Sequence, residues 1–85
     1  YDMGVQIHVC GGPIATAAAL QVEAAIPNFT IHEEHNANLL DIFIKAGKYY
    51  YKPENGYYTV PDLPGIGQEM TDEFLATCRK VVIGG

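Results

Sequence analysis

The sequence predicts an α/β fold built on a parallel βαβ unit, and two patterns near its start carry this prediction. Residues 5–9 and residues 28–33 alternate apolar and polar side chains, as half-buried strands do. Between them, an alanine-rich apolar stretch at residues 14–25 follows the turn Gly11-Gly12. A strand, a helix and a second strand in this order place the two strands parallel and adjacent. Because two parallel strands alone do not make a stable sheet, we expect further strands from outside this chain.

The predicted helix over residues 14–25 is apolar around most of its circumference. Its polar side chains are Thr16, Gln21 and Glu23. Pro13 suits the first turn of a helix, and Pro27 disfavours helical backbone in the residue before it, so the two prolines bracket the helix. A helix this apolar is usually buried on several sides. The chain also enters a strand within a few residues of Tyr1, and both features predict that it is a piece of a longer protein.

A short helix and a tight turn are predicted in the middle of the chain. Asn36 or Asn38 is expected to cap a helix over residues 39–45, which Gly47 ends. Tyrosine-rich segments flank Asn55-Gly56, and this dipeptide predicts a β-hairpin because it supplies the positive φ angles that such a turn needs. The tyrosines are expected to pack against another surface.

The last third of the chain predicts a loop and one more helix. Residues 61–67 are expected to be irregular because prolines and glycines interrupt them. Thr71 is expected to cap the final helix, with Asp72 and Glu73 placed favourably at its positive end.

The composition fits one small globular unit and argues against several functions. Of 85 residues, 48% are hydrophobic, and the formal net charge is −5. The few basic residues are scattered, so we do not expect a nucleic-acid partner. No apolar run approaches the roughly 20 residues of a membrane-spanning helix. Cys10 and Cys78 are expected to be reduced thiols of a cytoplasmic protein, with one disulfide as the alternative.

Two ionisable residues fall near the carboxyl ends of the predicted strands, where parallel α/β architectures bind ligands. His8 lies in the first strand and Glu33 in the second. Adjacent strands are about 5 Å apart, so the two side chains can face one pocket. Histidine suits proton transfer near neutral pH, and a carboxyl group can donate or accept a hydrogen bond. His8 and Glu33 are therefore the candidate catalytic pair; a hydrogen-bonded structural histidine is the alternative.

Other residues nearby predict weaker sites. His32 and His35 lie three apart at a strand end, not four apart on a helix as in zinc proteases, so a histidine metal site is disfavoured. His35 is a candidate substrate-binding residue at the pocket rim. Gly11-Gly12 opens a helix N-terminus that can receive an anion, although a tight turn is the simpler interpretation. Cys10 is expected to be a small buried residue, with a thiol that lines the pocket as the alternative.

Two longer segments resemble a known family. HVCGGPIATAAALQVEAAIPNFTIHEE and NGYYTVPDLPGIGQEM resemble the C-terminal end of enolase superfamily proteins of the mandelate racemase/muconate lactonizing enzyme family. Within that family the resemblance is closest to galactonate dehydratase-type acid-sugar dehydratases. The most specific parts are His8 with the Gly-Pro-Ile-Ala after it, Pro27-Asn28 before the strand that ends in Glu33, and the closing Val-Pro-x-x-Pro-Gly-x-Gly.

The resemblance implies a fold and a place for this chain within it. Members of the family combine an N-terminal capping domain with a modified (β/α)7β barrel, similar to a TIM barrel. Residues 1–47 would then be the end of the barrel, with its seventh and eighth strands, and residues 48–85 a tail that returns toward the capping domain. A complete barrel takes about 250 residues. The chain would therefore need the remainder of the barrel as a partner and would be inactive alone.

The resemblance also implies a chemistry. His8 would be the acid or base at the end of the seventh strand, and Glu33 the group that hydrogen-bonds the substrate carboxylate, with Glu34 as its rival. Family members use Mg2+, and its ligands would lie in the missing barrel strands, none in this chain. The expected function is dehydration of a galactonate-like sugar acid to a 2-keto-3-deoxy acid by an enzyme that is a homo-oligomer when complete.

Three other functions stay open on the sequence alone. A racemase, an epimerase or a cycloisomerase of the same superfamily would share the abstraction of the proton next to the carboxylate and differ in the fate of the intermediate. A stand-alone small binding domain would fold without partners and carry no catalysis. A small metal-binding protein would depend on His32 and His35.

Overall fold

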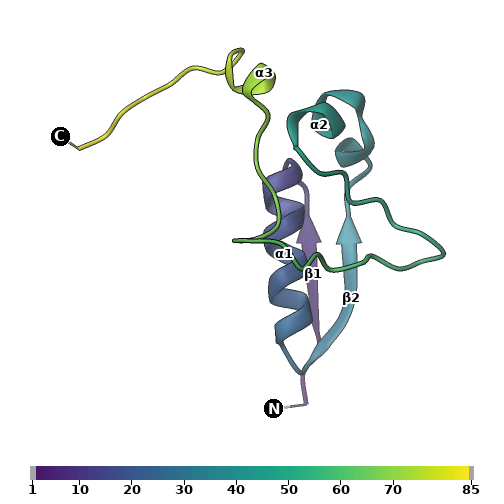
Figure 1. Cartoon of the computed structure of the whole chain (residues 1–85). Coiled ribbons are helices and arrows are strands. Elements are labelled where there is room, and N and C mark those ends of the chain that lie inside the picture. The colour runs from purple at the N-terminus through teal and green to yellow at the C-terminus, as the bar shows by residue number, and fades with distance from the viewer. Residues whose placement is uncertain (1, 85) are drawn as a thin grey trace.

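The computed structural model describes residues 2–84, except for the side chains of residues 37 and 38. Figure 1 shows two strands that run side by side, one helix packed along them, and a C-terminal end that leads away from the rest. No helix within residues 2–84 is long and apolar enough to cross a membrane. In chain order the elements are β1 (Val5–Val9), α1 (Pro13–Ala25), β2 (Phe29–Glu34), the 3-10 turn η1 (Asn36–Leu39), α2 (Asp41–Ala46) and α3 (Asp72–Leu75).

Strands β1 and β2 form a parallel pair, which confirms the predicted βαβ unit. β1 has the predicted bounds, and β2 begins and ends one residue later than predicted, so that Glu34 belongs to the strand. His8 lies opposite Glu33, and the register shifts only at the start, between Val5 and Gln6. The described residues supply two strands of sheet.

Helix α1 packs one face against the sheet. Its buried apolar residues are Ala17, Ala19 and Leu20. Val9 of β1 is also buried, and Pro13 occupies the first turn of the helix, as predicted. Val22 is 50% exposed, so the helix keeps apolar surface for a neighbour. The sequence predicts that α1 is buried on several sides, and this chain supplies only part of that burial.

Helix α2 begins later than predicted. Asn36 does not cap it, because η1 comes first and the N-cap is Leu40, which makes no side-chain hydrogen bond. The alternative cap, the Asn38 side chain, lies outside the described residues. The helix starts instead at Asp41, whose carboxylate in the first turn complements the helix dipole. Gly47 ends the helix, as predicted.

The Asn55-Gly56 turn forms, but the predicted hairpin does not extend beyond it. The φ angles of Asn55 and Gly56 are 52° and 80°. Glu54 and Tyr57 exchange two backbone hydrogen bonds, of 2.8 and 2.9 Å, and form an isolated bridge. The flanking tyrosine-rich segments are not strands.

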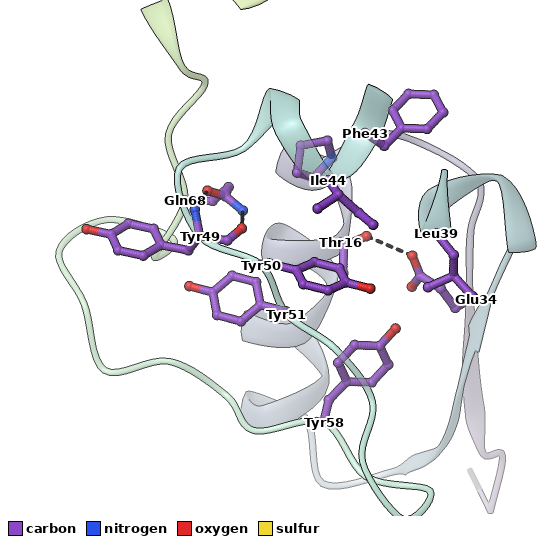
Figure 2. Close-up of a pocket in the computed structure, with 11 residues that line it drawn as sticks. Thr16, Glu34, Leu39, Phe43, Ile44, Tyr49, Tyr50, Tyr51, Tyr58 and Gln68 are labelled. Carbon is purple, nitrogen blue, oxygen red and sulfur yellow. Dashed lines mark hydrogen bonds between the residues drawn. The ribbon is translucent and has the colours of Figure 1, made fainter. Parts of the chain in front are cut away.

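The first tyrosine segment pairs with a later part of the tail, which explains the short hairpin. The backbone N–H of Tyr49 donates to Gln68 Oε1 (3.0 Å), and Gln68 Nε2 donates back to the Tyr49 carbonyl (2.6 Å). The Tyr51 hydroxyl donates to the carbonyl of Gly67. Figure 2 shows these side chains around a small cavity beside α1, where Tyr50 and Tyr58 also point inward. The predicted packing of the tyrosines is met in part: Tyr49, Tyr51 and Tyr58 are half-buried around this cavity, whereas Tyr57 is 78% exposed.

Helix α3 has the predicted cap. Thr71 Oγ1 accepts a hydrogen bond from the Phe74 N–H (3.3 Å), and Asp72 and Glu73 occupy the first turn. The backbone N–H of Thr71 donates to the Ala46 carbonyl (2.8 Å), at the end of α2. The tail is thereby anchored to α2.

Replacing Gly67 by alanine is expected to lower the free energy of unfolding by about 1–3 kcal/mol. Its φ is +78°, and a Cβ there would lie 2.7 Å from Pro61 Cγ and 3.1 Å from Tyr51 Oη. Gly65→Ala is the matched control, because φ is +64° while a Cβ there meets nothing within 4 Å. Thermal unfolding of the two variants separates the clash from backbone strain. Equal melting temperatures would contradict this packing of the tail.

Candidate active site

The sheet brings His8 and Glu33 together on the face away from α1. Each residue lies one position before the end of its strand, and the parallel register sets them opposite one another. His8 Nδ1 is 2.8 Å from Glu33 Oε1. The two side chains are 57% and 49% exposed, so the pair lies open on one side. The pairing that the alternation of the strands predicts is therefore present in the structure.

Gln6 joins this pair and was not among the candidates predicted from the sequence. Gln6 Nε2 donates to Glu33 Oε2 at 2.5 Å. The hydrogen bond from Gln6, followed by that from His8, lowers the pKa of Glu33 below its usual value. The signal was available in the sequence, because Gln6 lies two residues before His8 and shares its face of the strand.

This arrangement assigns different tasks to the two ring nitrogens of His8. An ionised Glu33 only accepts hydrogen bonds, so the nitrogen that it contacts, Nδ1, carries the proton. Nε2 is then the ring atom that can exchange a proton with a bound molecule. A carboxylate behind an imidazole also stabilises the positive charge that the ring gains on protonation. The pair is suited to proton transfer.

A second cluster lies on the opposite face, between β2 and α1. His32 Nδ1 is 2.6 and 2.8 Å from the two carboxylate oxygens of Glu23. Its Nε2 hydrogen-bonds Glu34, which also accepts from Thr16 Oγ1 at 2.9 Å (Figure 2). The Tyr58 ring meets His32 edge-on, with ring centroids 5.0 Å apart. This buried cluster separates Glu34 from the site and leaves Glu33 as the carboxylate that meets His8.

The ionisation of His32 follows from these contacts. Burial alone would lower the pKa of His32, but the hydrogen bonds to Glu34 and Glu23 outweigh it and raise the pKa above its usual value. From the sequence, His32 was considered only for a metal site, which its spacing from His35 disfavours, and it was not connected with Glu23. A polar residue within an otherwise apolar helix was the available signal for that contact.

The remaining candidates lie at the same end of the sheet or in its connections. His35 follows β2 directly and is exposed, and its backbone N–H donates to the Val9 carbonyl (2.9 Å). Cys10 is exposed in this chain, not buried as expected, because it follows the end of β1; Cys78 is also exposed, and both thiols are free. Gly12 is the N-cap of α1, in keeping with a tight strand-to-helix turn.

The residues that the structure describes do not fit a magnesium site. Mg2+ prefers near-octahedral coordination by oxygen atoms. Glu33 brings a carboxylate to the site face, but its two oxygens accept hydrogen bonds from Gln6 and His8. Among residues 2–84 no three His, Cys, Asp or Glu side chains are arranged to hold a metal ion.

Comparisons with known proteins agree with this architecture. Residues 1–74 match the family described as Enolase C-terminal domain-like. D-galactonate dehydratase from Cronobacter sakazakii is 39% identical over 86% of this chain, and that from Ralstonia pickettii is 37% identical over 94%. A solved structure of a member of the enolase superfamily from Salmonella Typhimurium is 59% identical over 89% of the chain, with a TM-score of 0.85.

These matches cover a small part of each relative. The chain spans 20% of the Cronobacter protein, 22% of the Ralstonia protein and 20% of the Salmonella chain. It therefore corresponds to about a fifth of the length of the relatives that it matches.

Proposed function

Because the chain belongs to the Enolase C-terminal domain-like family, we propose that it is the C-terminal segment of an acid-sugar dehydratase of galactonate dehydratase type. Residues 1–47 would complete the barrel, and residues 48–85 would return toward a capping domain. The remaining strands would come from outside the 85 residues. The similarity to D-galactonate dehydratases supports this proposal, as does the share of their length that the chain spans.

The observation that carries the proposal is the pair formed by His8 and Glu33. The two side chains meet at 2.8 Å near the carboxyl ends of parallel strands, on the face away from the covering helix. In a closed barrel this face lines the interior, and the carboxyl ends of the strands form the active-site mouth. A proton-transfer pair at that place suits chemistry on a small substrate within the barrel.

Loss of water needs two proton transfers. A base removes the proton next to the substrate carboxylate, and the electron pair moves into the carboxylate to give an enediolate. We place that base in the missing part of the barrel. His8, protonated at Nε2 and held at Nδ1 by Glu33, then donates a proton to the β-hydroxyl, which leaves as water. The resulting enol then tautomerises to the 2-keto-3-deoxy acid: its hydroxyl group loses a proton and the carbon that carried the departed hydroxyl gains one.

The role of Glu33 in this proposal is to hold and charge-balance His8. The resemblance also implies a hydrogen bond from this carboxyl group to the substrate carboxylate, which requires a proton on Glu33. The lowered pKa of Glu33 disfavours that proton in the unliganded chain. We therefore propose that the main role of Glu33 is its hydrogen bond to His8. Its contact with the substrate carboxylate stays a prediction.

The proposal includes further expectations about the cofactor, the cellular location, the oligomeric state and the rim of the site. Magnesium is expected in the complete enzyme, with ligands from strands other than β1 and β2, since residues 2–84 hold no cluster of side chains arranged for a metal ion. We place the enzyme in the cytoplasm, expect it to be a homo-oligomer, and retain His35 as a residue at the rim of the site. The proton transfers assigned to His8 do not depend on these points.

The test begins with the intact mass of the purified protein under denaturing conditions. We expect a chain of several hundred residues, or a second polypeptide that supplies the remaining strands. The complete protein is then incubated with a panel of aldonates in the presence of magnesium. We expect a 2-keto-3-deoxy acid, detected with a semicarbazide or thiobarbiturate assay.

Other results would select other functions. An epimerised sugar acid without loss of water would favour a racemase or epimerase of the same superfamily. A folded, monomeric species of 9.3 kDa without any further polypeptide would contradict the barrel proposal and favour a stand-alone binding domain.

A further inference from the structure

The cluster on the helix face of β2 is chemically unusual for a buried position. The side chains of His32 and Glu23 are only 8% and 5% exposed. Glu34 is 14% exposed and meets the other nitrogen of the same ring. Two carboxylates thus flank one imidazole in a place that largely excludes water. Burying ionised groups is costly unless each is paired and hydrogen-bonded.

With both carboxylates ionised, the hydrogen bonds require a protonated ring. A neutral imidazole has one N–H donor, whereas both nitrogens of His32 face carboxylate oxygens. The imidazolium form donates from both nitrogens and leaves the cluster with a single net negative charge. Thr16 donates a further hydrogen bond to Glu34 from α1. With its proton, His32 satisfies both buried carboxylates.

This bridge connects α1 to the residues on either side of Glu33. His32 and Glu34 precede and follow Glu33, and strand alternation sends them to the opposite face. Fixing both of them against α1 fixes the direction in which Glu33 points. A one-residue slip of β2 would turn each of its side chains to the other face. The contacts of His32 and Glu34 with α1 therefore keep Glu33 on the face of His8. The bridge lies in the regular part of the register, beyond the shift between Val5 and Gln6.

We propose that protonated His32 is a positioning residue, which ties β2 to α1 and so keeps the Glu33 carboxylate aimed at His8. The inference rests on the proposed function only for its effect on turnover, because its effect on the site geometry is independent of the reaction. Loss of the proton would leave two buried carboxylates facing a ring that can donate to only one of them. We expect β2 to loosen from α1 when that happens.

The direction of the pH effect depends on the surroundings of His32. The groups that face it are Glu23 from α1, Glu34 on its own strand and the Tyr58 ring from the tail. Burial, followed by nearby acidic groups, raises the pKa of Tyr58 to about 12, so its hydroxyl stays neutral over the working range. The pKa of His32 in the folded protein lies above its usual 6.5. The stabilisation by the bridge is therefore complete below pH 6.5 and is lost as the pH rises through the raised value.

The test uses His32→Gln in the complete protein. Glutamine can donate to one carboxylate but carries no charge, so we expect kcat to fall by about 10- to 100-fold, as misplaced catalytic groups do. KM should change much less than kcat. In the wild-type protein both kcat and the melting temperature should fall as the pH rises through the raised pKa of His32, whereas the variant should lack this fall.

Two further variants serve as controls. The double variant Glu23→Gln/His32→Gln places one amide against another and removes a buried charge, so it should recover most of the melting temperature and part of kcat, without the fall at high pH. Glu54→Gln removes a carboxylate from the exposed turn and should match the wild-type protein. If His32→Gln fails to fold, the pH profile of the double variant still tests whether the fall in kcat at high pH depends on His32.

Several results would overturn the proposal. A lower melting temperature in His32→Gln, with kcat and its pH profile unchanged, would make His32 purely structural. A fall at high pH that persists in the double variant would assign that fall to another group. If the wild-type protein turns over no sugar acid, the proposed function fails, but a crystal structure of His32→Gln still tests the inference. Retention of the 2.8 Å contact between His8 and Glu33 in that variant would contradict it.

Discussion

Replacing His8 by asparagine in the complete protein is expected to lower kcat for loss of water by about 10²- to 10⁴-fold. The asparagine amide can occupy the place of Nδ1 and keep the hydrogen bond to Glu33, which is 2.8 Å in the structure. It has no group at the place of Nε2, so it cannot give a proton to the departing hydroxyl. The change therefore removes proton transfer while it preserves most of the packing.

Exchange of the substrate proton in heavy water identifies the step that His8 serves. If His8 acts as the acid that expels the hydroxyl, His8→Asn should still exchange the proton next to the carboxylate with solvent deuterium while dehydration stops. Loss of both exchange and dehydration would instead make His8 the base at that carbon and contradict its assignment as the acid. Glu54→Gln, on the exposed turn, is the control for handling and folding.

The paired site was predictable from the sequence because it depends on two local periodicities. Alternation along residues 5–9 and 28–33 gave the faces of the strands, and the βαβ order gave their parallel pairing. The position of His8 opposite Glu33 results from those two facts. Gln6 has the same alternation and was overlooked because an amide is not itself an acid or base.

Features that depend on contacts between distant segments were not predictable in the same way. Glu23 meets His32 only because α1 docks on β2 at one particular height, and spacing along the chain does not reveal that height. The Asn55-Gly56 turn was predicted from its dipeptide, but the strands expected around it do not form. Gln68, from the later part of the tail, takes up the backbone groups of Tyr49 that a hairpin ladder would have used.

Replacing Glu33 by glutamine is expected to lower kcat by about 100-fold. The amide oxygen can still accept a hydrogen bond from His8, but it does not stabilise the positive charge that the ring carries as an acid. The amide nitrogen then faces Gln6 Nε2, donor against donor, so the hydrogen bond from Gln6 is lost unless the Gln6 amide turns its oxygen toward it. The effect should appear mainly in kcat, because the proposed task of Glu33 is on His8.

The pH dependence distinguishes loss of this charge from general damage to the site. The pKa of Glu33 is lowered from 4.5, first by Gln6 and then by His8, so the carboxylate form persists at pH 4.5 and is lost as the pH falls through the lowered value. The ratio of wild-type to Glu33→Gln activity should hold steady between pH 4.5 and pH 6.5 and decline below pH 4.5. Gln6→Met keeps the side-chain length without the donor, and it should move the decline to higher pH. A Glu33→Gln enzyme with wild-type kcat would show that His8 works without this carboxylate.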